Sequence, residues 1–108
     1  MKIFLDTADV NEVARRVNTG LISGVTTNPT LIKKSGRKPS DVYRELDNLD
    51  YITDVSIEVV ADTAVVMYEE GITVADTYET ATIKLPCTEE GLRACQMLND
   101  QKIRTNVT

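Results

Sequence analysis

The stretch Thr80-Ala81-Thr82-Ile83-Lys84-Leu85-Pro86-Cys87 places a lysine at the centre of an apolar, β-prone run. Strand formers on both sides of Lys84 predict a β-strand. An amine that is taken out of water loses solvation, and the lowered pKa of such a group makes a neutral, nucleophilic amine available near neutral pH. This amine can form a Schiff base with a carbonyl. The alternative is that Lys84 lies at a strand end and extends its ammonium into solvent.

Short strands alternate with helical stretches along the whole chain, and a turn or capping signal marks each transition. The strands are expected at residues 3–6, 24–28, 55–60, 80–87 and 103–108. Helices are expected from the capping box Asp9–Glu12 to Gly20, from Pro29, from Pro39, from Thr63 to about Ala75, and after a cap at Thr88. This βαβα order predicts an α/β fold with parallel strands and covering helices.

Polar residues recur beside apolar neighbours in the predicted strands. They are Asp6, Thr26, Glu58, Lys84, Asn106 and Thr108. Side chains alternate between the two faces of a sheet, so one face of each strand is apolar and the other is polar. Both faces of a parallel sheet are normally apolar. The pattern therefore predicts a closed barrel with a site inside it, near the C-terminal ends of the strands. An open doubly wound sheet is the alternative, but the sequence lacks the usual glycine-rich phosphate loop.

Composition narrows the class of protein. The 108 residues, 42% hydrophobic and 27% charged, indicate a soluble globular chain without an internal domain boundary. No stretch approaches the roughly 20 apolar residues of a membrane span, so we expect a cytoplasmic protein. A net charge of −5 argues against nucleic acid as a partner, and residues 33–38 are expected to be a solvated basic loop. Cys87 and Cys95 lack C-x-x-C spacing and histidine is absent, so we expect no metal site and no histidine triad.

Four motifs carry a resemblance to a known family. They are Ile3–Ala8, Gly24–Pro29, Ile83–Leu92 and Thr105–Thr108. In order and spacing they resemble the small transaldolases and the related fructose-6-phosphate aldolases, over essentially the whole chain. The resemblance implies a TIM barrel that uses a Schiff-base lysine, here Lys84, and no cofactor. Residues 1–108 would then be the N-terminal half of the barrel, with about four and a half of its eight (β/α) units.

The resemblance also implies the catalytic roles. Lys84 would attack the ketone of a ketose phosphate. Glu58, through a water, would be the acid/base group for the carbinolamine, and Asp6 would take the proton of the sugar hydroxyl as the carbon–carbon bond breaks. From the residues alone, Glu58 has the alternative of an ion pair with Lys84, and Asp6 that of a helix N-cap.

Four further residues are expected to bind substrate. Asn28 and Asn106 would hydrogen-bond the hydroxyls of the three-carbon unit, while Thr26 and Thr108 would help to hold the water and the Schiff base. Cys87 is close to the site in sequence, but without a histidine partner it is expected to be a bystander.

Glutamate at position 58 resembles the transaldolase branch, because the aldolase branch usually carries glutamine there. The reaction implied is dihydroxyacetone transfer from a ketose phosphate to an aldose acceptor in the pentose phosphate pathway. An aldolase that releases dihydroxyacetone stays open.

The family's phosphate-binding residues would come after Thr108. The chain is therefore expected to be a truncated fragment, a half barrel that pairs with another chain, or a natural short homologue. A homo-oligomer of half barrels without catalytic activity is the competing hypothesis to an enzyme.

Overall fold

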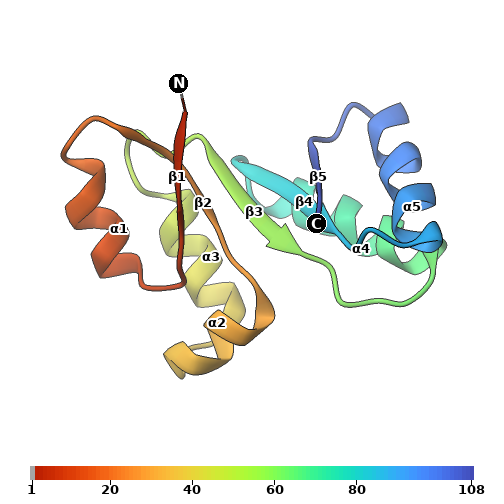
Figure 1. Cartoon of the computed structure of the whole chain (residues 1–108), viewed down its shortest axis with the longest axis horizontal. Helices are drawn as coiled ribbons and strands as arrows, with labels where there is room; N and C mark the ends of the chain where they lie inside the picture. Colours follow the sequence, from red (N-terminus) through yellow and green to blue (C-terminus); the bar gives the residue numbers. More distant parts are fainter. Residues whose placement is uncertain (1) are drawn as a thin grey trace.

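The computed structural model describes residues 2–108. Its five strands form one parallel sheet in the order β1-β2-β3-β4-β5 (Figure 1). The strands are β1 (Ile3–Asp6), β2 (Ile22–Thr26), β3 (Asp54–Glu58), β4 (Ala81–Leu85) and β5 (Thr105–Val107). The helices are α1 (Val10–Val17), α2 (Pro29–Ser35), α3 (Pro39–Asp47), α4 (Ala64–Thr77) and α5 (Glu89–Asp100). Each strand pairs with the next one in the chain, and the helices cover one side of the curled sheet. The predicted parallel α/β fold of TIM-barrel type is confirmed as a half barrel.

Several predicted boundaries are wrong by a few residues. The second strand was expected at residues 24–28, whereas β2 ends at Thr26 and Asn28 already caps α2. The strand β5 covers only three residues, and α4 continues to Thr77. The basic segment expected to be a loop is partly helical, because Lys33 and Lys34 form the last turn of α2; both are exposed.

Side-chain caps fix where three of the helices begin. Asp9 accepts a hydrogen bond from the backbone N–H of Glu12 at the start of α1, and Thr88 accepts one from Gly91 at the start of α5. Asn28 does the same for Leu31 in α2. Because Asp9 caps α1, the alternative interpretation of Asp6 as the N-cap of this helix is wrong.

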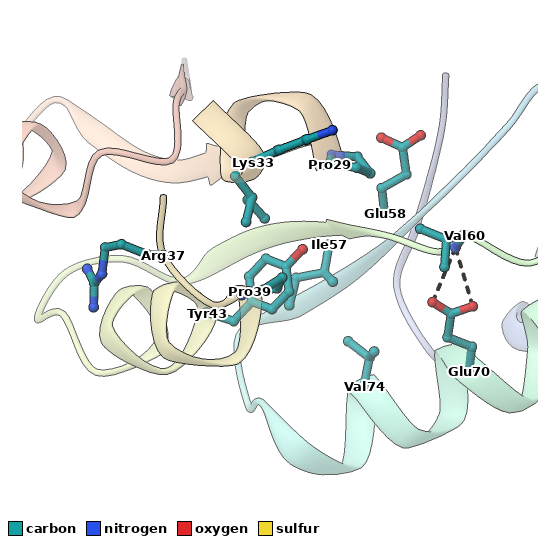
Figure 2. A pocket seen from close by; sticks show the side chains of 11 residues that line it. Pro29, Lys33, Arg37, Pro39, Tyr43, Ile57, Glu58, Val60, Glu70 and Val74 are labelled. Atoms are coloured by element: carbon teal, nitrogen blue, oxygen red, sulfur yellow. Dashed lines mark hydrogen bonds between the residues drawn. The ribbon is translucent and has the colours of Figure 1, made fainter. Parts of the chain in front are cut away.

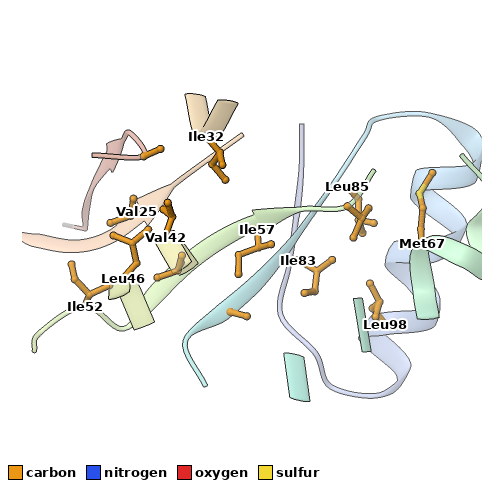
Figure 3. Close-up of a cluster of buried hydrophobic side chains, with 14 of the residues drawn as sticks. Val25, Ile32, Val42, Leu46, Ile52, Ile57, Met67, Ile83, Leu85 and Leu98 are labelled. Carbon is orange, nitrogen blue, oxygen red and sulfur yellow. The ribbon is translucent and has the colours of Figure 1, made fainter. Parts of the chain in front are cut away.

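The hydrophobic core lies between the sheet and the helices, in two regions joined across β3 (Figure 3). On one side of Ile57, Val42 and Leu46 of α3 pack beneath β2 and β3. On the other side, Met67 of α4 and Leu98 of α5 pack against β4. Burial of these side chains is the main source of stability, at about 25 cal/mol per Å² of apolar surface.

The opposite, inner face of the sheet is not covered by helices, and Gly24 shows how closely it is packed. A Cβ atom at Gly24 would lie 2.7 Å from the Asp54 carbonyl oxygen and 2.7 Å from the ring of Phe4. Only glycine therefore allows Phe4 to lie across β2 at this end of the sheet. Within the described residues, no helix is both long enough and apolar enough to cross a membrane.

Candidate active site

The register of the sheet places the predicted polar residues on the inner face in two rows. In the first row, Asp6 pairs with Thr26, and Thr26 pairs with Ser56. In the second row, Glu58 pairs with Lys84, and Lys84 pairs with Asn106. Both rows lie at the C-terminal half of the strands, because parallel strands bring the same ends together.

Lys84 lies between a carboxylate and a backbone carbonyl. Its Nζ is 3.8 Å from Glu58 Oε2 and donates a long hydrogen bond of 3.5 Å to the carbonyl oxygen of Thr27. The side chain of Lys84 is 14% exposed and that of Glu58 is 26% exposed. The alternative of a solvent-facing lysine is therefore wrong, while the ion pair that was the alternative role for Glu58 is present. A carboxylate this close to an amine can also exchange protons with it through one water.

Asp6 and Thr26 form the second pair of the site. The hydroxyl of Thr26 donates to Asp6 Oδ1 over 2.9 Å, between adjacent strands. This bond occupies one oxygen of the carboxylate and fixes its orientation. Asp6 itself is exposed on the inner face, so its second oxygen can accept a proton from a bound molecule.

Asn106 contacts Ser56, a residue for which no role was predicted from the sequence. Its side-chain amide donates to Ser56 Oγ over 3.4 Å. Ser56 is buried and lies two residues before Glu58, on the same face of β3. The signal was present in the sequence, because Ser56 stands between Val55 and Ile57 just as Glu58 stands between Ile57 and Val59. At both positions, a polar residue between two apolar ones indicates a side chain on the inner face of the sheet.

Asn28 and Thr108 lie just beyond the ends of their strands, outside the two rows. Asn28 Oδ1 accepts from the N–H of Leu31, which leaves its amide N–H₂ group for other partners. The backbone of Thr108 is bonded to β4 and to the turn after it: its N–H donates to Leu85, and its carbonyl accepts from Cys87. Both cysteines are free thiols. Across residues 2–108, no three His, Cys, Asp or Glu side chains are grouped so that they could hold a metal ion.

A cavity of about 470 Å³ meets this site only at Glu58. It is lined chiefly by apolar residues from α2, α3, α4 and β3, among them Tyr43, Ile57 and Val74. Figure 2 shows Tyr43 and Val74 on the helix side of β3, with Glu58 directed to the other side. The polar rows that could bind a sugar therefore lie on the open inner face of the sheet, apart from this cavity.

Comparisons with known proteins identify the family of the chain. The model of the family described as Transaldolase/Fructose-6-phosphate aldolase matches residues 3–108. A protein named "Probable transaldolase" from Geobacter sulfurreducens is 48% identical over 110 residues, covering 100% of this chain and 50% of the relative. Proteins of the same name from Dinoroseobacter shibae and Thermoplasma acidophilum are 47% and 45% identical, again over the whole chain and 49% of each relative.

The chain thus spans about half the length of the curated relatives that it matches. The matched range, residues 3–108, contains all five strands. The chain therefore belongs to the transaldolase/fructose-6-phosphate aldolase family.

Proposed function

We propose that this chain carries the Schiff-base machinery of a transaldolase and acts on sugar phosphates. The substrates would be a ketose phosphate donor and an aldose phosphate acceptor, and the unit transferred would be dihydroxyacetone. The observation that carries the proposal is the position of Lys84 Nζ, 3.8 Å from the Glu58 carboxylate on a largely buried stretch of strand. Family membership supports the same assignment. A place in the cytoplasmic pentose phosphate pathway is part of the proposal.

The first half of the reaction forms a bond between nitrogen and carbon. The neutral amine of Lys84 adds to the ketone carbon, and a proton moves to the former carbonyl oxygen to give a carbinolamine. Glu58, through a water, then supplies the proton with which this hydroxyl leaves as water. The product is a protonated Schiff base, whose positive charge draws electrons from the neighbouring carbon–carbon bond.

The second half breaks that carbon–carbon bond. Asp6 accepts the proton of the adjacent sugar hydroxyl, the hydroxyl carbon becomes an aldehyde, and the bonding electrons move into the Schiff base. A three-carbon enamine stays on Lys84. Asn28 and Asn106 would hydrogen-bond its hydroxyls, with Thr26 orienting Asp6 and Thr108 adding a further polar group. Attack of the enamine on the acceptor aldehyde, with Asp6 returning its proton to the new hydroxyl, forms a Schiff base again. Hydrolysis of this Schiff base takes up one water in place of the one released earlier, returns a proton to Glu58 and frees the product and the amine of Lys84.

Covalent trapping tests this proposal. The 108-residue chain is incubated with fructose 6-phosphate and borohydride, which reduces a Schiff base to a stable secondary amine, and the modified lysine is identified by peptide mass spectrometry. We expect a sugar-derived mass on Lys84, and none there in Lys84→Met. The exposed Lys38 serves as the reference for non-specific glycation. Equal labelling of Lys84 and Lys38, or none on Lys84, would contradict the proposal.

A non-catalytic half barrel is the competing function. The observation that favours it is the sheet itself, in which β1 and β5 each pair with only one neighbour in the described chain. Such edges can pair with another chain, so we propose a homo-oligomer of half barrels as the form in which the site would be enclosed.

An aldolase is the other alternative to a transaldolase. Release of free dihydroxyacetone in the absence of an acceptor would indicate an aldolase.

A further inference from the structure

The Thr27 peptide group lies against the amine of Lys84 and is itself held on two sides. Thr27 directly follows β2 and is fully buried, at 0% exposure. Its backbone N–H donates to the Ser56 carbonyl over 3.3 Å, and its hydroxyl donates to the same carbonyl over 2.9 Å. Two hydrogen bonds from one residue to one acceptor fix the position of the Thr27 nitrogen, Cα atom and side chain relative to β3.

The carbonyl oxygen of Thr27 points in the direction of Lys84, where it accepts from Nζ at 3.5 Å. The two bonds to Ser56 hold the nitrogen, the Cα atom and the side chain of Thr27, and the next residue, Asn28, is held as the N-cap of α2. The peptide group that carries the Thr27 carbonyl is therefore held at both ends, and its oxygen cannot turn away unless a hydrogen bond at one end is broken. The loss of such a bond leaves a buried polar group unpaired, at a cost of about 1–3 kcal/mol. The carbonyl therefore offers the amine an acceptor at a fixed place.

Tyr43 of α3 supports Thr27 from the helix side. Burial raises the pKa of the Tyr43 hydroxyl, and the nearby side chain of Thr27 acts in the opposite direction; Figure 2 shows that hydroxyl directed to β3. The ring of Tyr43 is held in turn by Tyr78, with 5.8 Å between ring centroids and planes at 71°.

We propose that Thr27 is a positioning residue for the Schiff-base lysine, with its buried hydroxyl as the group that keeps the Thr27 carbonyl at the amine. This acceptor keeps Nζ facing the inner side of the sheet, where the ketone would bind, and its loss would leave the amine freer to move and more accessible to reagents in solution. The proposal rests on the proposed function for its catalytic consequence, but the position of the amine can be measured separately.

The test compares two substitutions at one position. Thr27→Val keeps the size and removes the hydroxyl, whereas Thr27→Ser keeps the hydroxyl. With fructose 6-phosphate and borohydride, we expect the saturating trapping rate of Thr27→Val to fall about tenfold, with the half-saturating sugar concentration little changed. Thr27→Ser should stay within about twofold of the original chain. Similar losses in both variants would overturn the proposal, because the hydroxyl would then not matter.

A second readout needs no sugar. Isotope-coded acetic anhydride labels free amines, and the ratio of labelling at Lys84 to that at Lys38 reports the accessibility of the Lys84 amine in folded protein. We expect this ratio to rise roughly fivefold in Thr27→Val, the factor that corresponds to one lost hydrogen bond, and not in Thr27→Ser. A merely structural role would lower the free energy of unfolding without changing the ratio under folding conditions, and that outcome would overturn the proposal.

The two readouts separate the possible failures. If the original chain traps no sugar but the labelling ratio rises in Thr27→Val, the proposed function fails while the positioning role of Thr27 stands. If trapping occurs at Lys84 and neither readout changes in Thr27→Val, only the positioning role fails. Should Thr27→Val not fold, Tyr43→Phe, which removes one supporting hydroxyl, is expected to change both readouts in the same direction by a smaller factor. An unchanged ratio in that variant would overturn the proposal.

Discussion

At Lys84 the amine is in contact with groups from two other elements, the neighbouring strand β3 and the turn after β2. The Glu58 carboxylate and the Thr27 carbonyl both face an ammonium that has lost most of its water, at 14% exposure. Removal of either group would leave a buried charge with one partner fewer, which is more costly than the loss of an exposed ion pair. This explains why the lysine can occupy the centre of a strand.

The hydroxyl of a single residue, Tyr43, gives a prediction about how the stability of the chain depends on pH. Burial raises the pKa of the Tyr43 hydroxyl above its ordinary value. The unfolded chain therefore releases this proton at lower pH than the folded chain does. The contribution of the protonated Tyr43 hydroxyl to the stability of the folded chain is fully present below about pH 10, the ordinary tyrosine pKa. It is lost as the pH rises through the pKa that this hydroxyl has in the folded chain. Urea unfolding between about pH 8 and about pH 11 should show a shallower decline in stability for Tyr43→Phe than for the original chain.

Tyr51 is the matched control for this measurement, because its side chain is 80% exposed. We expect the stability of Tyr51→Phe to fall with pH as steeply as that of the original chain. If Tyr43→Phe declined just as steeply, the loss of stability at high pH would belong to other groups.

Residue patterns in the sequence placed Glu58 and Lys84 on the polar face of the sheet and left an ion pair between them as the alternative role for Glu58, whereas the contact with Thr27 was not predicted. Glu58 and Lys84 could be recognised because side chains alternate along a strand. The contact with Thr27 uses a backbone carbonyl, which every residue has. Only the turn from β2 into α2 decides where that oxygen points.

The helices differ in how their first turns are fixed. Thr88 caps α5 through a hydrogen bond of 3.0 Å to Gly91, and Glu89 and Glu90 add favourable charge at this helix N-terminus. Gly91 also passes so close to the Pro86 carbonyl that a Cβ atom there would collide with it. Thr63 occupies the same position at α4, yet its side chain makes no capping bond within the described chain.

Because only Thr88 makes a capping bond, replacing each threonine by alanine should lower the free energy of unfolding by different amounts. Thr88→Ala should lower the free energy of unfolding by about 1 kcal/mol, because one backbone N–H of α5 loses its acceptor. Thr63→Ala should cost less than about 0.5 kcal/mol. Urea unfolding at neutral pH measures both values. Equal losses would mean that the hydrogen bond in α5 contributes little.

Element boundaries were predictable where a local signal fixes them. Asp9 and Thr88 are side-chain caps, and the helices begin where the sequence predicted them. The end of β2 was not predictable in the same way. Residues 24–28 all suit an extended conformation, and pairing with β3 together with the cap at Asn28 decides which of them belong to the strand.

At the scale of the whole molecule, the proposed pairing of half barrels concerns β5, which pairs with β4 alone among residues 2–108. Bonds to β4 use the carbonyl of Arg104 and the N–H of Thr108. Backbone groups alternate in direction along a strand, so the N–H of Val107 faces away from β4. Val107 is 38% exposed. An edge of this kind is a template for pairing with a second copy.

We expect the chain to associate with increasing concentration in sedimentation velocity experiments. Val107→Pro removes the outward N–H without affecting the bonds to β4, so the association constant should fall about tenfold or more. Val107→Ala keeps the N–H and should associate like the original chain. A chain that stays monomeric at all concentrations, or a proline variant that associates normally, would contradict pairing through β5.

The sequence by itself determined the order of elements, the parallel α/β class, and the apolar and polar faces of the strands. These properties depend on local propensity and on alternation over a few residues. The tertiary structure decided the register that sets Asp6 beside Thr26 and Lys84 beside Glu58, and the direction of the Thr27 carbonyl. Such contacts join residues 20 to 57 positions apart. Their geometry is fixed by the packing of whole strands and helices, so no short stretch of sequence contains it.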